Sequence, residues 1–242
     1  MGCNKNLLCV IFIILVLYVL YCRHINSEQE PEYDQEDLTT AWTSMWKQHC
    51  REMYVDLKLG DHVCVVDTEF SPDTIIDEVQ DKLKHRQLRW TKKRHANYPT
   101  TDIPVTPKTL PITNSLKERL LKEVVAPEIK RAYDIDENNI SYQEAFVVRY
   151  SASNDHQHGL KPHVDGSPLS FVCALNDDFV GGGTRFIKTG DTYNLKKGQC
   201  CIFPGINQHE GVPVTKGERW ILTGFLNYGP TALECKRLFR VS

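Results

Sequence analysis

The carboxyl-terminal half of the chain is a succession of short β-branched and aromatic runs separated by turn residues, beginning at Tyr142. Glycine breaks such as Gly190 and Gly198 divide these runs, and no long helical pattern interrupts them. This texture predicts a compact barrel or sandwich. The expected strands cover residues 143–151, 160–165, 168–176, 184–188, 192–195, 199–204, 207–213 and 219–227.

The preceding segment, residues 51–140, has helical patterns and is expected to form a supporting region for the sheet. Ser71 followed by Pro72 is typical of a helix start, and apolar residues then recur at helical spacing for about four turns. Ser115 with Glu118 has the capping-box pattern and predicts a second helix, which Pro127 should kink. Two such helices are expected to brace one sheet.

The amino-terminal run Leu7–Cys22 is continuously apolar and carries no charge over 16 residues. We expect an uncleaved membrane anchor within residues 1–27, although a cleaved signal peptide is the competing interpretation. An acidic stalk, residues 28–50, would follow it. The favoured topology is single-pass type II, with the large domain in the lumen of the endoplasmic reticulum or Golgi. The strand-rich residues 141–242 form the expected catalytic core.

Charge and cysteine usage exclude several functional classes. The formal net charge of −2 gives no general attraction to nucleic acid, so no nucleic-acid partner is expected. The basic stretch at residues 82–95 is interpreted as a solvated helix end. No CxxC pair occurs among the nine cysteines, which removes the main support for zinc-finger and thioredoxin-type folds. Cys173 and Cys200 lie in apolar runs and are expected to be plain core residues.

Four polar residues in the strand-rich half form a candidate site. His163 and Asp165 are two positions apart in an expected strand, so their side chains should share a face. His209 follows His163 by 46 residues, and Arg219 follows His209 by 10. Two histidines and one carboxylate with open coordination positions suit a non-haem Fe(II) oxygenase. Arg219, on a strand expected to pair with that of His209, can hold a carboxylate bidentately.

Five segments carry a family resemblance: "AFVVRY", "PHVDGSPLSF", "ALNDDFVGGGTRF", "KGQCCIFPG" and "HEGVPVTKGERW". In order and spacing they resemble the Fe(II)- and 2-oxoglutarate-dependent dioxygenases of the procollagen hydroxylase group, and they look closest to the lysyl hydroxylase catalytic domain. The resemblance runs from residue 97 to residue 229. It implies a mainly β fold with flanking helices and a double-stranded β-helix (jelly-roll) core.

The resemblance also implies roles for the site residues. His163, Asp165 and His209 would bind Fe(II), and Arg219 would hold the distal carboxylate of the co-substrate 2-oxoglutarate. Tyr150 matches a family tyrosine that lines the co-substrate pocket, and Thr184 stands where the lysyl enzymes have cysteine. L-Ascorbate is the expected reductant for oxidised iron.

The function implied is hydroxylation of lysine or proline side chains in secretory-pathway proteins, so the expected partner is a protein or peptide substrate. The arginine at position 219 favours the lysyl branch, because the prolyl enzymes usually have lysine there. Two other classes remain open. One is a 2-oxoglutarate oxygenase for a different substrate, such as a nucleic-acid demethylase, and the other is a catalytically silent binding module on the same fold.

Overall fold

The computed structural model describes residues 59–95, 97–153 and 156–228. These residues belong to the second of two compact units, Trp46–Ser242. The expected tail, anchor and stalk lie outside the described residues. Within the described ranges, no helix has the length and apolar character needed to cross a membrane.

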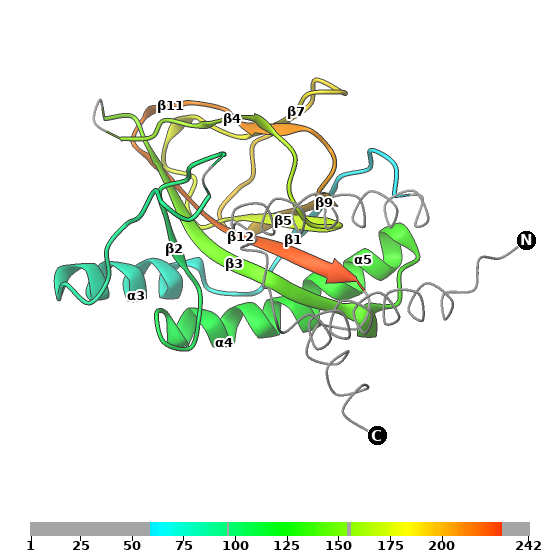
Figure 1. Cartoon of the computed structure of the whole chain (residues 1–242), viewed down its shortest axis with the longest axis horizontal. Coiled ribbons are helices and arrows are strands. Elements are labelled where there is room, and N and C mark those ends of the chain that lie inside the picture. The colour runs from blue at the N-terminus through cyan, green and yellow to red at the C-terminus, as the bar shows by residue number, and fades with distance from the viewer. Residues whose placement is uncertain (1–58, 96, 154–155, 229–242) are drawn as a thin grey trace, which may run out of the picture. The chain divides into compact units, whose positions relative to one another are not determined.

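The larger of two main sheets has six strands in the order β1-β9-β5-β12-β3-β2, all pairs antiparallel. Its two longest strands, β3 and β12, pair over almost their whole length and form the spine seen in Figure 1. The strand bounds are β1 Cys64–Asp67, β2 Asp102–Pro104, β3 Ile140–Ser151, β5 Leu169–Ala174, β9 Gln199–Pro204 and β12 Glu218–Tyr228.

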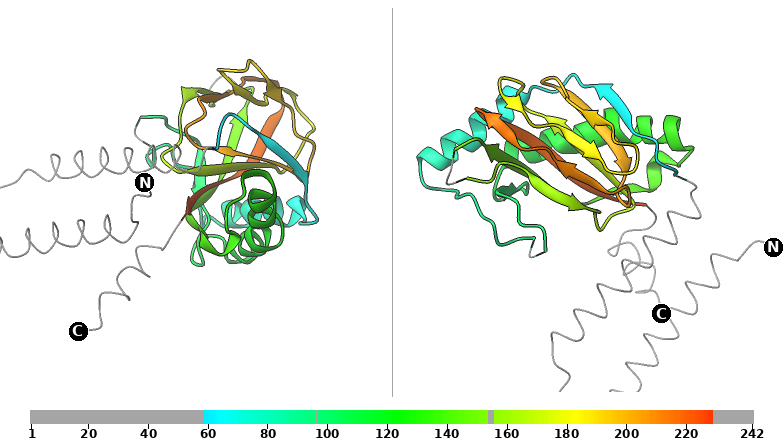
Figure 2. Two further views of the ribbon diagram at one scale, coloured as in Figure 1. Left: turned by 90° about the vertical axis from the view of Figure 1, so that its right-hand side faces the viewer. Right: turned by 90° about the horizontal axis from the view of Figure 1, so that it is seen from above.

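The smaller sheet has four antiparallel strands in the order β4-β10-β7-β8, and β11 pairs separately with β6. Figure 2 shows these short strands facing the larger sheet across the interior. Their bounds are β4 Leu160–His163, β6 Val180–Gly181, β7 Thr184–Phe186, β8 Thr192–Tyr193, β10 His209–Gly211 and β11 Val214–Lys216.

Helices cover the outer face of the larger sheet (Figure 1). They are α3 Pro72–Lys84, α4 Pro111–Leu120 and α5 Ala126–Tyr133, with a π-helical turn, η1 Leu121–Val125, between the last two and a short 3₁₀ turn, η2 Glu137–Asn139, after them. The π turn comes just before Pro127, where the sequence predicts a kink, because proline lacks the N–H that would continue the helical hydrogen bonds.

The larger sheet is buried on both faces. Successive residues of each strand point alternately toward the helices and toward the smaller sheet. Val147 and Leu222 belong to the core shared with the helices, whereas Val148 and Ile221 belong to the core between the two sheets. Because side chains alternate along a strand, Arg219 shares the inner face with Ile221. Parity therefore directs a charged residue into the interior of the jelly roll.

The mainly β jelly-roll class with flanking helices is confirmed, but several local expectations were wrong. The second helix begins at Pro111, so Ser115 lies inside it and forms no capping box. Its first amide groups bond instead to the carboxylate of Glu78 from α3, with Ile112 N at 3.0 Å and Thr113 N at 2.7 Å. The carboxylate of Glu78 therefore caps the start of α4, which was the role expected of Ser115 and Glu118.

Two strands and one cysteine pair also differ from expectation. β1 and β2 lie within the segment expected to be helical, where each extends an edge of the larger sheet. Cys173 of β5 and Cys200 of β9 are fully buried, as expected for core residues, but they are cross-strand neighbours joined as a disulfide.

Candidate metal and co-substrate site

Three potential metal ligands meet at the end of the smaller sheet. His163 ends β4 and His209 begins β10, and the two residues are directly opposite in the antiparallel pair. Asp165 joins them: its two carboxylate oxygens lie 3.5 Å from His163 Nε2 and 3.8 Å from His209 Nε2. One donor atom from each residue falls within a 4.8 Å cluster.

Each histidine is oriented by its other ring nitrogen. The Nδ1 of His163 lies 2.8 Å from the carbonyl oxygen of Lys161, and the Nδ1 of His209 lies 2.8 Å from that of Asn207. A carbonyl accepts only from a protonated nitrogen, so each Nδ1 carries hydrogen and each Nε2 is free to bind a metal. The donor set therefore fits a divalent transition metal with open coordination positions.

Asp165 reaches the site from beyond the strand. β4 ends at His163, two residues earlier than predicted. Asp165 is therefore outside the strand, and its side chain does not project from the same strand face as that of His163. The backbone N–H of Asp165 instead donates to the carbonyl of Gly205, at 2.8 Å, which fixes the turn that carries it. The carboxylate is almost completely buried, with a side-chain exposure of 3%.

Burial affects the protonation of His163. Desolvation lowers the pKa of His163, with a further lowering from His209, and the carboxylate of Asp165 only partly opposes this. A depressed histidine pKa favours the neutral imidazole, which is the form that coordinates a metal.

The triad lines a cavity of about 340 Å³ between the sheets. Its inner part is formed by Tyr150, Thr184 and Arg219, all buried. Arg219 is the direct cross-strand partner of Tyr150, and its guanidinium carbon lies 5.8 Å from the centre of the tyrosine ring. The structure places all three of these residues in the lining of this one cavity.

Arg219 is held in place by two acceptors. Its terminal nitrogens donate to the carbonyl of Gly183 at 3.0 Å and to the hydroxyl of Thr184 at 3.1 Å. No carboxylate of the described residues forms a salt bridge with it, so a buried positive charge remains for an anion to compensate. Burial lowers the pKa of the guanidinium.

The strand pairing that was expected to carry Arg219 was wrong. β12 pairs with β3 and β5 in the larger sheet, whereas β10, with His209, pairs with β4 and β7 in the smaller one. Arg219 and His209 therefore face the cavity from opposite sheets, which leaves space between them for a small molecule.

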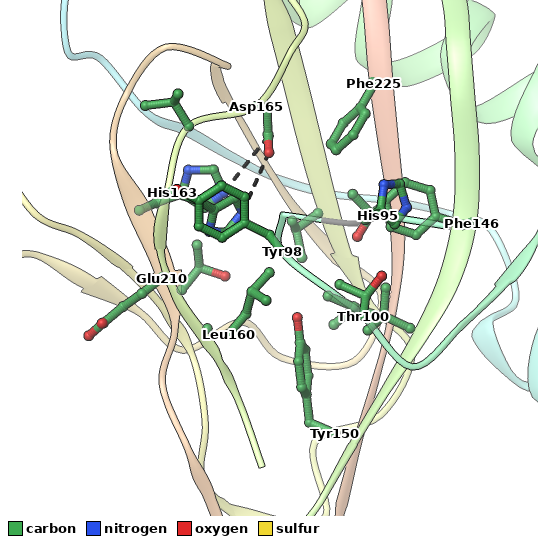
Figure 3. Close-up of a pocket in the computed structure, with 18 of the residues that line it drawn as sticks. His95, Tyr98, Thr100, Phe146, Tyr150, Leu160, His163, Asp165, Glu210 and Phe225 are labelled. Atoms are coloured by element: carbon green, nitrogen blue, oxygen red, sulfur yellow. Dashed lines mark ion pairs between the residues drawn. The ribbon is translucent and has the colours of Figure 1, made fainter. Parts of the chain in front are cut away.

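Sequence reasoning assigned no role to one wall of the cavity. His95, Tyr98 and Thr100, from the loop before β2, all line it. Figure 3 shows Tyr98 in front of His163, and His95 beside Phe146 on the opposite side. The segment "NYPTTDI" marks where the family resemblance begins, and it was the available signal for this wall.

These features define a class of protein: a double-stranded β-helix in which two histidines and one carboxylate are placed as potential metal ligands, next to a cavity that holds a buried arginine. Residues 145–227 match the family model described as the 2OG-Fe(II) oxygenase superfamily. This part of the chain is a 2OG-Fe(II) oxygenase domain, and Fe(II) and 2-oxoglutarate are the metal and co-substrate of that superfamily.

Curated relatives include procollagen lysine hydroxylases. The chain is 31% identical over 170 residues to procollagen-lysine,2-oxoglutarate 5-dioxygenase 1 of Rattus norvegicus, covering 66% of this chain and 23% of that protein. It is 41% identical over 88 residues to a multifunctional procollagen lysine hydroxylase and glycosyltransferase of Caenorhabditis elegans, covering 34% of this chain and 12% of that protein. The chain thus spans less than a quarter of the length of these relatives.

Solved structures with the same fold include a prolyl-4-hydroxylase of Pseudomonas putida. It aligns with a TM-score of 0.51 at 16% sequence identity, covering 72% of this chain and 96% of that one. At this identity the likeness is one of fold.

Proposed function

We propose that the protein is an Fe(II)- and 2-oxoglutarate-dependent dioxygenase that hydroxylates lysine or proline side chains of secretory-pathway proteins. The observation that carries the proposal is the convergence of His163, Asp165 and His209 on one wall of a cavity whose buried part holds the charge of Arg219. Neither a binding module nor a structural domain needs this combination.

Each residue has a proposed task. His163, Asp165 and His209 would hold Fe(II), which when bound activates dioxygen and couples its reduction to decarboxylation of 2-oxoglutarate. Arg219 would bind the distal carboxylate of 2-oxoglutarate, with Thr184 keeping the guanidinium in position. Tyr150 would line the co-substrate pocket as a neutral phenol, because burial raises its pKa to about 12.

The cavity wall would exclude water from the reacting atoms. Phe146, Val148, Ile221 and Phe225 give it an apolar lining next to the triad. Such a lining favours transfer of oxygen to the bound substrate over reaction with solvent. L-Ascorbate would restore iron oxidised in cycles without substrate, as the resemblance to lysyl hydroxylases implies.

Succinate release from 2-oxoglutarate by the purified full chain with Fe(II) and ascorbate tests the reaction class. Stoichiometric succinate with a collagen-like peptide, and a mass gain of one oxygen on its lysine or proline, is the expected result. Succinate without any peptide modification would point to a different substrate class, and absence of succinate would favour a silent binding module.

Membrane anchoring through Leu7–Cys22 and a luminal domain are part of the proposal. Asn139, in the sequon Asn139-Ile140-Ser141, is exposed at the end of η2 and is a built-in reporter of orientation. A glycan at Asn139 that disappears in Asn139→Gln, together with protease protection in intact microsomes, would support the luminal placement. Complete digestion without detergent would overturn it.

A further inference from the structure

The cavity has a buried part and an exposed rim. Arg219 and Tyr150 are each only 3% exposed, whereas two other lining residues, Tyr98 and Val164, are 41% and 48% exposed. A small dicarboxylate can reach the buried part, but a polypeptide can enter only as far as its side chains extend. A polymeric substrate must therefore meet the rim first.

Tyr98 is the aromatic residue of that rim nearest to the proposed metal ligands. Its ring centre lies 5.2 Å from that of His163, with the planes tilted by 34°. Figure 3 shows the Tyr98 ring across the front of the cavity, before His163. An exposed tyrosine contributes a large contact area with few rotatable bonds, which suits a residue that receives a partner.

The backbone around Tyr98 is fixed by one side chain from another segment. Gln157, between β3 and β4, donates from Nε2 to the carbonyl of Pro99 at 2.8 Å and to that of Gly159 at 3.0 Å. Its Oε1 accepts from the N–H of Thr101 at 2.7 Å. The amide group thus uses both donors and its acceptor to join the Tyr98 loop to the β3–β4 connection.

The same loop has a second attachment at its other end. Arg94 pairs with the fully buried carboxylate of Asp102 at 2.7 Å and with Glu144 of β3 at 2.5 Å. Attachment on both sides sets the position of the Tyr98 ring before any substrate arrives. Such preorganisation reduces the ordering cost of binding.

From these contacts we infer that Tyr98 is a substrate-contacting residue, against which the polypeptide next to the modified side chain packs, and that Gln157 is its positioning residue. The inference rests on the proposed function in one respect, that the substrate is a polypeptide. It assigns the substrate-binding rim to a loop outside the segment matched by the family model, residues 145–227.

Two measurements on the full chain test the contact. The first is the dissociation constant of fluorescent collagen-like peptides that carry lysine or proline before glycine, measured by fluorescence anisotropy. The second is the KM for 2-oxoglutarate. Tyr98→Ala should weaken binding of the better peptide about tenfold or more, the usual loss when an interface tyrosine is truncated. The KM for 2-oxoglutarate should stay within about twofold, because the buried end is untouched. Tyr98→Phe keeps the ring and should bind like the wild type.

Gln157 is tested by two variants. Gln157→Ala should raise both the dissociation constant and the KM for the peptide, with little change in kcat. The reason is that the variant displaces Tyr98 without touching the reacting atoms. Gln157→Glu keeps the acceptor for Thr101 but puts a carboxylate oxygen against the carbonyls of Pro99 and Gly159, so its effect should be at least as large as that of the alanine variant. Val180→Ala, at an exposed apolar residue that does not line the cavity, is the matched control and should change nothing.

The outcomes separate the inference from the enzymatic proposal. Unchanged peptide binding in Tyr98→Ala, or failure of the wild type to bind either peptide, overturns the inference even where 2-oxoglutarate is turned over. Peptide binding that depends on Tyr98 in a protein without succinate release supports the contact and overturns only the enzymatic function.

Discussion

His163 and His209 are cross-strand partners whose ring centres lie 4.4 Å apart, and each is fixed by a carbonyl two residues before it in the chain. The repeated arrangement means that strand pairing itself sets the distance between two proposed metal ligands. Only the carboxylate of Asp165 then has to be added from a turn. A site built in this way is rigid before metal binds, which favours an open metal site with few protein ligands.

Replacing Asp165 with alanine should abolish Fe(II) binding and 2-oxoglutarate turnover while the protein stays folded. The variant removes the only anionic ligand of the proposed triad, so we expect affinity to fall by more than the roughly 100-fold that loss of a supporting residue costs. Metal content after dialysis and thermal unfolding are the measurements. Asp191→Ala, at an exposed carboxylate in the connection between β7 and β8, is the control. Full metal occupancy in the Asp165 variant would contradict the site.

Arg219→Ala should leave metal binding intact and weaken 2-oxoglutarate by about 2–5 kcal/mol, the range for losing one partner of a buried charge pair. Arg219→Lys should recover part of that loss, because lysine restores the charge without the planar fork. The KM for 2-oxoglutarate in turnover without peptide measures both. An unchanged KM in the alanine variant would mean that the co-substrate binds elsewhere.

Thr184→Val tests whether the hydroxyl that accepts from Arg219 matters for co-substrate binding. Valine keeps the shape but leaves one terminal nitrogen of the guanidinium without this acceptor. A hydrogen bond to a charged group contributes about 1.5–3 kcal/mol, so the KM for 2-oxoglutarate should rise about tenfold or more. Thr184→Ser retains the hydroxyl and should remain close to the wild type. Equal KM values in the two variants would assign Thr184 a packing role only.

The residues of the candidate site were predicted from sequence by their combination and spacing and by the family resemblance, because no single one of these residue types is specific by itself. His163, Asp165, His209 and Arg219 were identified without knowing how the strands pair, and the structure gathers them round one cavity even though the expected pairing of Arg219 with the strand of His209 was wrong. Side chains alternate along β12, so Arg219 must share the inner face with the apolar Ile221, two positions away. This inward direction does not depend on which strands are the neighbours of β12.

Features that depend on distant contacts were not predictable in the same way. The start of α4 is set by Glu78, which lies more than 30 positions away, so the local signal at Ser115 was misleading. Tyr98 has no distinctive pattern of its own, and its place over His163 results from Gln157 on another segment. Short edge strands such as β1 form because they pair with an existing strand of the sheet, here β9. The β propensity of the short segment alone does not predict this pairing.

The two free cysteines of the described part, Cys64 and Cys201, should resist alkylation in the native protein. Burial raises the pKa of both thiols, to about 12 for Cys201. At pH 8 only about one Cys201 thiol in ten thousand would be ionised, and the thiolate is the reactive form. Peptide mapping after iodoacetamide should find both cysteines unmodified until the protein is unfolded in urea. Rapid native labelling of Cys201 would show that the inner core is open to solvent.

Glu78→Gln should destabilise the fold without altering the reaction. The buried carboxylate accepts hydrogen bonds from Ile112 N, Thr113 N and the hydroxyl of Thr113, at the amino terminus of α4, where a negative charge is favoured. Glutamine keeps the shape but replaces one acceptor oxygen with a donor, which should lower the free energy of unfolding by about 1–3 kcal/mol. Urea denaturation measures this loss.

Asp73→Asn on the same helix breaks only an exposed ion pair with Lys197, so it should cost less than about 1 kcal/mol. Because the helices lie on the outer face of the larger sheet, away from the cavity between the sheets, both variants should retain the wild-type KM for 2-oxoglutarate at temperatures where they are folded. Equal stability of the two variants would show that α4 does not depend on Glu78 for its start.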